Sequence, residues 1–172
     1  MMKQEFENLI GKEVSDKDYE VIDRVYTFHP AISETEGKKQ IADIYNAGGM
    51  TVIRGMLEAA DIMNSFLLNH DMWADTTIYF NGKCFSTYDK ETGKFYYNDP
   101  KHLVVIEDED PRDYFEYVAE DHILSMSFEG SVCHMLSYGT APGIKRQFDK
   151  IFEKYGIYYE LGNHWNFTCY YR

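Results

Sequence analysis

Residues 76–88, TTIYFNGKCFSTY, decide the fold class of this chain. Strand-forming residues flank Asn81-Gly82 on both sides, and this dipeptide accepts the positive φ angles of a two-residue β-hairpin turn. We therefore predict two antiparallel strands, residues 76–80 and 83–88. Ahead of this hairpin the apolar residues recur with helical spacing, and within it they take a period of about two. The helical part of the chain is thus expected to end just before it.

The N-terminal half is predicted to contain about four helices. Residues that cap or stop helices mark their limits: Gly11, Ser15 with Asp18, Pro30, Ser33 with Glu36, and Gly48-Gly49. The fourth helix, residues 51–69, is the longest and carries an apolar stripe along one face. Because only the two glycines separate it from the third helix, we expect these two helices to form an antiparallel pair.

The C-terminal half is predicted to be an antiparallel β-sheet with one long amphipathic covering helix. Further strands are expected at 102–106 and 123–128, and a closing hairpin at 157–171. The covering helix begins near Pro142 and stops at Gly156. The fold class is therefore α+β, with a helical domain at 1–72 and an α+β domain at 73–172. No low-complexity linker separates them, so the two are compatible with one packed unit.

The composition indicates a folded acidic protein. The chain of 172 residues has 44% hydrophobic residues, including 15 Tyr and 11 Phe, which is too much apolar surface for a disordered tail. Its net charge of −12 argues against direct binding of nucleic acid or anionic lipid, so a charged partner should be basic. The N-terminus lacks a signal-peptide pattern and no run is long enough to span a membrane, so we expect a cytoplasmic protein.

The negative charge is concentrated between residues 98 and 130, where ten Asp and Glu face only Lys101 and Arg112. We interpret part of this stretch as a protein-binding surface, because the aromatic residues Tyr114, Phe115 and Tyr117 are interleaved with its carboxylates. The simpler interpretation is a solvated surface that keeps the protein soluble. The predicted partner-binding residues are Glu107, Asp108, Glu109, Asp110, Asp113, Tyr114, Phe115, Glu116, Glu120 and Asp121.

The sequence predicts no catalytic residue, no metal site and no cofactor. The six histidines lack metal-ligand spacing, and the three cysteines are widely separated. Two alternatives remain open. One is a small enzyme, a hydrolase or nucleotide-modifying enzyme, with His102, His122 or His134 in its site. The other is a regulatory or structural adaptor whose helical half dimerises.

Two pairs of segments carry a resemblance to small uncharacterised proteins of bacterial mobile elements and prophages. The first pair is VSDKDYEVIDRVYTFHPAIS, residues 14–33, with GKKQIADIYNAGGMTVIRGM, residues 37–56. The second is LSMSFEG, residues 124–130, with IFEKYGIYYELGNHWNFTCYY, residues 151–171. Such elements encode small acidic inhibitors of host restriction or CRISPR nucleases. The resemblance therefore implies a location in the cytoplasm of a bacterial host.

Together, these observations lead to one hypothesis. The chain is a non-enzymatic inhibitor, an anti-CRISPR or anti-restriction protein, that binds a nucleic-acid-handling defence enzyme. Its carboxylates would mimic DNA phosphates, and Tyr114 and Phe115 would act as anchors.

Overall fold

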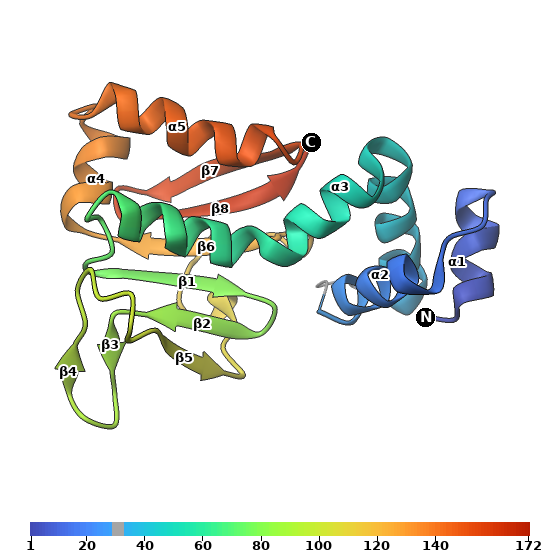
Figure 1. Cartoon of the computed structure of the whole chain (residues 1–172), viewed down its shortest axis with the longest axis horizontal. Coiled ribbons are helices and arrows are strands. Elements are labelled where there is room, and N and C mark those ends of the chain that lie inside the picture. The colour runs from blue at the N-terminus through green and yellow to red at the C-terminus, as the bar shows by residue number, and fades with distance from the viewer. Residues whose placement is uncertain (29–32) are drawn as a thin grey trace.

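The computed structural model describes residues 1–28 and 33–172, and it confirms an α+β fold in which helices precede an antiparallel sheet. Figure 1 shows the N-terminal helices at one end of the molecule and the sheet at the other. The helices are α1 (Lys3–Ile10), α2 (Asp16–Phe28), α3 (Glu34–Asn69), the short 3-10 helix η1 (Pro111–Asp113), α4 (Gly130–Ser137) and α5 (Pro142–Glu153). The strands are β1 (Thr76–Phe80), β2 (Lys83–Ser86), β3 (Tyr88–Asp89), β4 (Lys94–Phe95), β5 (Val104–Glu107), β6 (Leu124–Phe128), β7 (Ile157–Asn163) and β8 (Asn166–Tyr171).

Three of the predicted capping signals of the N-terminal helices are confirmed, at Gly11, Ser15 and Ser33. Gly11 closes α1 in the left-handed conformation, with φ of 71°. The backbone N–H of Asp18 donates to the Ser15 hydroxyl at the start of α2, and that of Glu36 donates to the Ser33 hydroxyl at the start of α3. The predicted stop at Pro30 lies outside the described residues.

The prediction that the third and fourth helices form an antiparallel pair is wrong. They are the two parts of α3, which bends at Gly49 (φ 62°, ψ −159°) and then continues to the sheet without folding back (Figure 1). An antiparallel helix pair needs a connection of about two to five residues, whereas here only Gly49 leaves the helical conformation. Within residues 1–28 and 33–72, the N-terminal half therefore has three helices, the last of them bent.

The predicted β1–β2 hairpin is confirmed. Phe80 pairs with Lys83 across the turn, and Asn81 and Gly82 have φ of 52° and 70°, as a type I′ turn requires. The strand order of the six-stranded sheet is β5-β2-β1-β6-β8-β7, with all neighbours antiparallel. The closing β7–β8 hairpin is also confirmed, while β3 and β4 form a separate two-stranded sheet.

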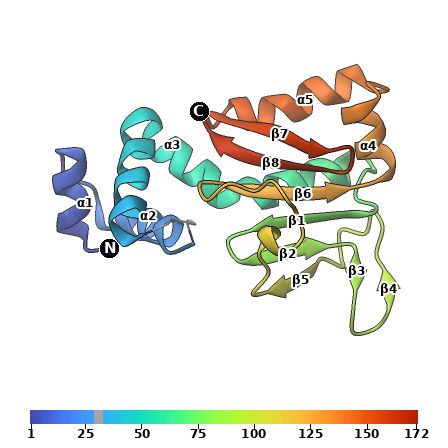
Figure 2. The same ribbon diagram turned by 180° about the vertical axis from the view of Figure 1, so that it is seen from behind.

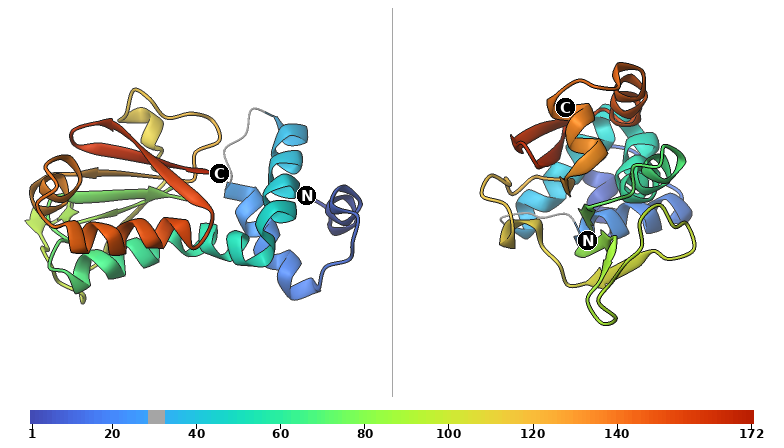
Figure 3. Two further views of the ribbon diagram at one scale, coloured as in Figure 1. Left: turned by 90° about the horizontal axis from the view of Figure 1, so that it is seen from above. Right: turned by 90° about the vertical axis from the view of Figure 1, so that its left-hand side faces the viewer.

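Two helices, not the single one predicted, cover one face of the sheet. The second part of α3 and the whole of α5 lie side by side on this face (Figures 1 and 3). Ile78, Met126 and Phe167 are neighbours in register on β1, β6 and β8, and all are fully buried beneath these helices. The long apolar stripe of α3 is thus used against the sheet, which explains why α3 extends away from the N-terminal helices.

The opposite face of the sheet is covered by the connection between β5 and β6. Because β5 is the edge strand and β6 lies inside the sheet, this connection has to pass behind β2 and β1. Figure 2 shows it with η1 on the side away from α3 and α5. It contains every residue of the predicted acidic site except Glu107, which is the last residue of β5.

Candidate functional site

The acidic segment, residues 107–121, leaves the sheet at the end of edge strand β5. Asp108 has a positive φ of 59°, which turns the chain away from the strand direction. The backbone N–H of Glu109 then donates to the carbonyl oxygen of Gly82 at 3.0 Å. The β1–β2 turn therefore holds the first residues of the segment in place.

Arg112 organises the middle of the segment. Its guanidinium lies 2.6 Å from the Asp110 carboxylate and 2.9 Å from the Glu120 carboxylate. Asp110 also accepts a hydrogen bond from the backbone N–H of Arg112 and so caps η1, as the Asp110-Pro111 pattern indicates. The hydrogen bonds from Arg112 lower the pKa of Asp110, so this carboxylate stays ionised in moderately acidic solution.

Phe115 attaches the segment to the back of the sheet. Its side chain is only 7% exposed and belongs to a small second core with Tyr79 of β1 and Cys84 of β2. Its ring meets those of Tyr79 and Trp165 edge-on, at centroid distances of 5.5 and 5.6 Å. The sequence hypothesis used Phe115 as a surface anchor, but its burial makes it a positioning residue in this structure.

Two tyrosines of the segment are exposed. Tyr114 is 50% exposed, packs on the Tyr79 ring, and donates its hydroxyl to the Glu109 carboxylate at 2.5 Å. This hydrogen bond to Glu109 is the main reason that the pKa of Tyr114 rises to about 12. Tyr117 is 71% exposed. Tyr114 and Tyr117, rather than Phe115, therefore offer aromatic surface next to the carboxylates.

Half of the carboxylates in the segment are neutralised within the chain. Lys83 lies 2.9 Å from Glu107, and Lys90 lies 3.3 Å from Glu109. Arg112 forms ion pairs with both Asp110 and Glu120. Sequence reasoning missed both lysines, because the Lys83–Glu107 contact depends on the register between β2 and β5. Within the described part of the chain, four exposed carboxylates have no ion-pair partner: Asp108, Asp113, Glu116 and Asp121.

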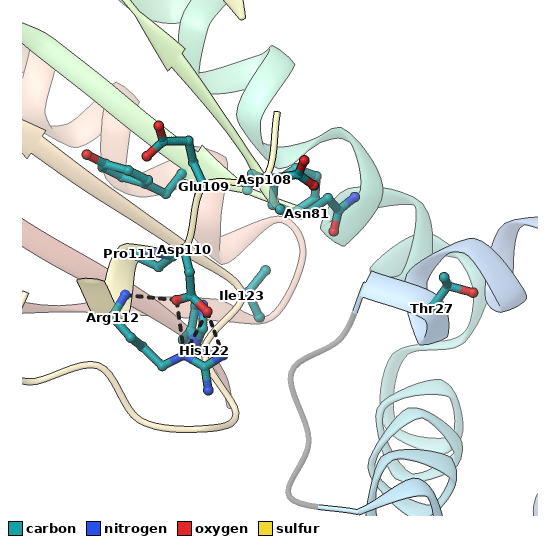
Figure 4. A pocket seen from close by; sticks show the side chains of 12 residues that line it. Thr27, Asn81, Asp108, Glu109, Asp110, Pro111, Arg112, His122 and Ile123 are labelled. Carbon is teal, nitrogen blue, oxygen red and sulfur yellow. Dashed lines mark hydrogen bonds and ion pairs between the residues drawn. The ribbon is translucent and has the colours of Figure 1, made fainter. Parts of the chain in front are cut away.

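A shallow pocket of about 330 Å³ lies between the segment and the β1–β2 turn (Figure 4). Asn81, Asp108 and Arg112 contribute to its rim, and the ring of His122 lies beside the Asp110–Arg112 pair. His122 is buried, and its Nδ1 is 2.9 Å from the carbonyl oxygen of Ala119. Burial lowers the pKa of His122, so the imidazole is neutral at physiological pH. The lining is mixed: Phe80, Pro111 and Ile123 are apolar, Arg112 is cationic, and Asp108 is a carboxylate without an ion-pair partner among the described residues.

The three histidines of the enzyme alternative lie on different elements. His102 stacks on Tyr96 and contacts Asp99 at 2.7 Å, His122 is buried ahead of β6, and His134 lies in α4. Among residues 1–28 and 33–172, no group of three His, Cys, Asp or Glu side chains is arranged to hold a metal ion.

The chain matches no known protein family, no curated protein and no solved structure. In the part of the chain that the structure describes, no helix has both the length and the apolar character of a membrane span. The fold and the surface therefore define this chain as an α+β protein with a positioned acidic segment, and its function has to be argued from that surface.

Proposed function

We propose that the chain is a non-enzymatic inhibitor that binds the basic, nucleic-acid-binding surface of a bacterial defence nuclease through the acidic segment. The observation that supports this most strongly is the combination of fixed backbone and free charge in the segment. Phe115 and the Gly82–Glu109 hydrogen bond hold the segment against the sheet, while Asp113, Glu116 and Asp121 stay exposed and unpaired among the described residues.

Fixed carboxylates suit this role better than a flexible acidic tail. A partner that binds a pre-organised surface loses less conformational entropy, so more of the electrostatic attraction contributes to affinity. The exposed rings of Tyr114 and Tyr117 add contact area beside these charges, as aromatic residues commonly do in protein interfaces.

The mechanism is competition. A nuclease groove that binds nucleic acid carries Arg and Lys side chains spaced for phosphates. Carboxylates at the surface of the inhibitor form ion pairs with these side chains and so prevent DNA or guide RNA from binding in the groove. The choice of a restriction or CRISPR nuclease as the target rests on the sequence resemblance of residues 14–33, 37–56, 124–130 and 151–171 to proteins of mobile elements.

The test is inhibition of a purified candidate nuclease by three forms of the protein. The first is the wild type, and the second is the triple variant Asp113→Lys, Glu116→Lys, Asp121→Lys. The third is a control with the same charge change on exposed residues of α3: Asp43→Lys, Glu58→Lys, Asp61→Lys. Circular dichroism and thermal unfolding establish that all three are folded.

The wild type and the α3 control should inhibit stoichiometrically, with an apparent affinity that falls as salt rises, and the segment variant should not inhibit. Equal inhibition by the segment variant would refute the acidic-segment mechanism. Inhibition at substoichiometric protein that a single substitution of His102, His122 or His134 abolishes would instead favour the enzyme alternative.

A further inference from the structure

The two edges of the six-stranded sheet differ in how they are protected. Edge strands of natural proteins are usually blunted by bulges or charges, because their free backbone groups can pair with another chain. The β7 edge has a register shift between Leu161 and Asn163 and carries Glu160 within the strand. The β5 edge pairs with β2 in continuous register and contains three consecutive β-branched apolar residues, Val104–Ile106.

The β5 edge is also open to a partner. Val105 is 42% exposed and Leu103 is 40% exposed. A groove of about 700 Å³ runs beside β5, and consecutive strand residues 104–107 all line it. Because successive side chains point to opposite faces of a sheet, a groove lined by all of them follows the edge rather than one face.

The charges near β5 are arranged asymmetrically along the strand. Lys101 and His102 precede it, and Glu107 ends it with Asp108 directly after. The Glu107 carboxylate also lies 2.9 Å from Lys83 of its own chain, whereas Asp108 has no ion-pair partner among the described residues. Lys90 and Glu91 reach the same groove from the β3–β4 turn, and Lys90 also pairs with Glu109 at 3.3 Å. Asp89 also lines the groove, but its carboxylate accepts hydrogen bonds from Glu91 and Thr92 within that turn.

We propose that the β5 edge is a dimer interface, at which a second copy of this chain pairs its own β5 in antiparallel orientation about a two-fold axis at Val105. In this register Val105 meets Val105 of the second copy, and Val104 meets Ile106. The basic end of each strand then lies against the acidic end of the other, with Lys101, in the turn that precedes β5, close to the Glu107–Asp108 end of the second copy.

This charge pattern selects the second copy as the occupant and sets the strand direction. A parallel arrangement would place Lys101 beside Lys101 and Glu107 beside Glu107, which is repulsive. The antiparallel arrangement also fits the rest of the sheet, where all neighbouring strands are antiparallel. The dimer extends the sheet continuously across the two copies and leaves no exposed β5 edge.

The first test measures molar mass by light scattering over a wide range of protein concentration. The wild type should show twice the 20.2 kDa mass of the chain at high concentration. Val105→Lys places two ammonium groups opposite each other and should move the monomer–dimer midpoint to at least about tenfold higher concentration. Leu161→Lys, an exposed position on β7, is the matched control and should dimerise as the wild type does.

A charge exchange identifies the register. Lys101→Glu and Glu107→Lys should each weaken the dimer. The double variant should dimerise more tightly than Glu107→Lys alone, because both of these variants lack the Lys83–Glu107 ion pair within the chain and differ only at Lys101. Lys101 precedes β5 and Glu107 ends it, and no ion pair joins them among the described residues, so the exchange tests a contact between two chains. Lys39→Glu and Glu153→Lys, both at exposed helical sites, control for net charge.

A wild type that remains monomeric at the highest concentration would overturn the proposal. Dimerisation that Val105→Lys leaves unchanged would also overturn it, and would point to the helical half instead. Neither measurement involves a nuclease, so the outcome is independent of the proposed inhibitor function.

Discussion

Phe115 is predicted to hold the acidic segment in place, and truncation to alanine tests this directly. Replacing a buried Phe by Ala typically costs about 3–5 kcal/mol of unfolding free energy, through lost burial and the cavity that remains. The core around Phe115 contains only Tyr79 and Cys84 as further buried residues, at the back of the sheet, so the segment can partly collapse into the space. We therefore expect the lower end of this range, about 3 kcal/mol.

Such a loss corresponds to a melting temperature lower by about 6–12 °C for a chain of this size. Urea unfolding followed by circular dichroism gives the free energy, and hydrogen exchange reports on the segment itself. Backbone amides of residues 109–121 should exchange faster in Phe115→Ala, while those of β8 should change only by the global loss. Tyr117→Ala, at a position 71% exposed, is the control and should stay within about 0.5 kcal/mol of the wild type. Equal stability of the two variants would refute the positioning role of Phe115.

Three further predictions concern the bend in α3, its packing and a buried histidine. Gly49→Ala should lower the unfolding free energy by about 1–3 kcal/mol, because φ 62° with ψ −159° suits only glycine. Gly143→Ala is the control in α5, where added atoms meet nothing within 4 Å, and an equal loss there would contradict the reasoning. Gly55→Ala should lower the unfolding free energy by about 1–3 kcal/mol, because its Cβ would lie 2.0 Å from the Tyr155 ring. The double variant Gly55→Ala, Tyr155→Ala lacks that ring, so its loss of unfolding free energy should be smaller than the sum of the losses in the two single variants. The pKa of His122 is lowered by burial, so its stabilising contribution is complete above the unfolded pKa of about 6.5 and decreases as pH falls below it. Unfolding free energies from neutral pH to about pH 5 should therefore show a decrease that His122→Gln reduces, and an unchanged pH profile in that variant would contradict the assignment.

The elements that sequence analysis predicted correctly are determined by residues close to one another in the sequence. Asn81-Gly82 sets the β1–β2 turn by its own backbone preferences, and Pro142 begins α5 as the covering helix requires. Helix α4 is not predicted from the sequence, because eight residues without a clear apolar period give little signal. The predicted antiparallel helix pair is wrong because the direction of the second part of α3 is set by its packing against the sheet. Local sequence patterns carry no information on that contact.

The candidate site shows the same limit. The sequence concentrates the carboxylates in one stretch, but it cannot reveal which of them the fold neutralises. Lys83 comes next to Glu107 only through strand pairing, and Lys90 approaches Glu109 from a different turn. Phe115 stands between charged neighbours in sequence, yet it is buried because the segment crosses the back of the sheet there.

The most direct test of the inhibitor proposal is a pull-down with tagged protein from nuclease-treated bacterial lysate, washed at low and at high salt and read by mass spectrometry. The proposal predicts that a restriction or CRISPR nuclease is captured at low salt and released at high salt. It also predicts that Asp113→Lys, Glu116→Lys, Asp121→Lys abolishes the capture while the α3 control retains it. Capture of the same nuclease by the segment variant, or a wild type that retains no basic nucleic-acid-handling protein, would contradict it.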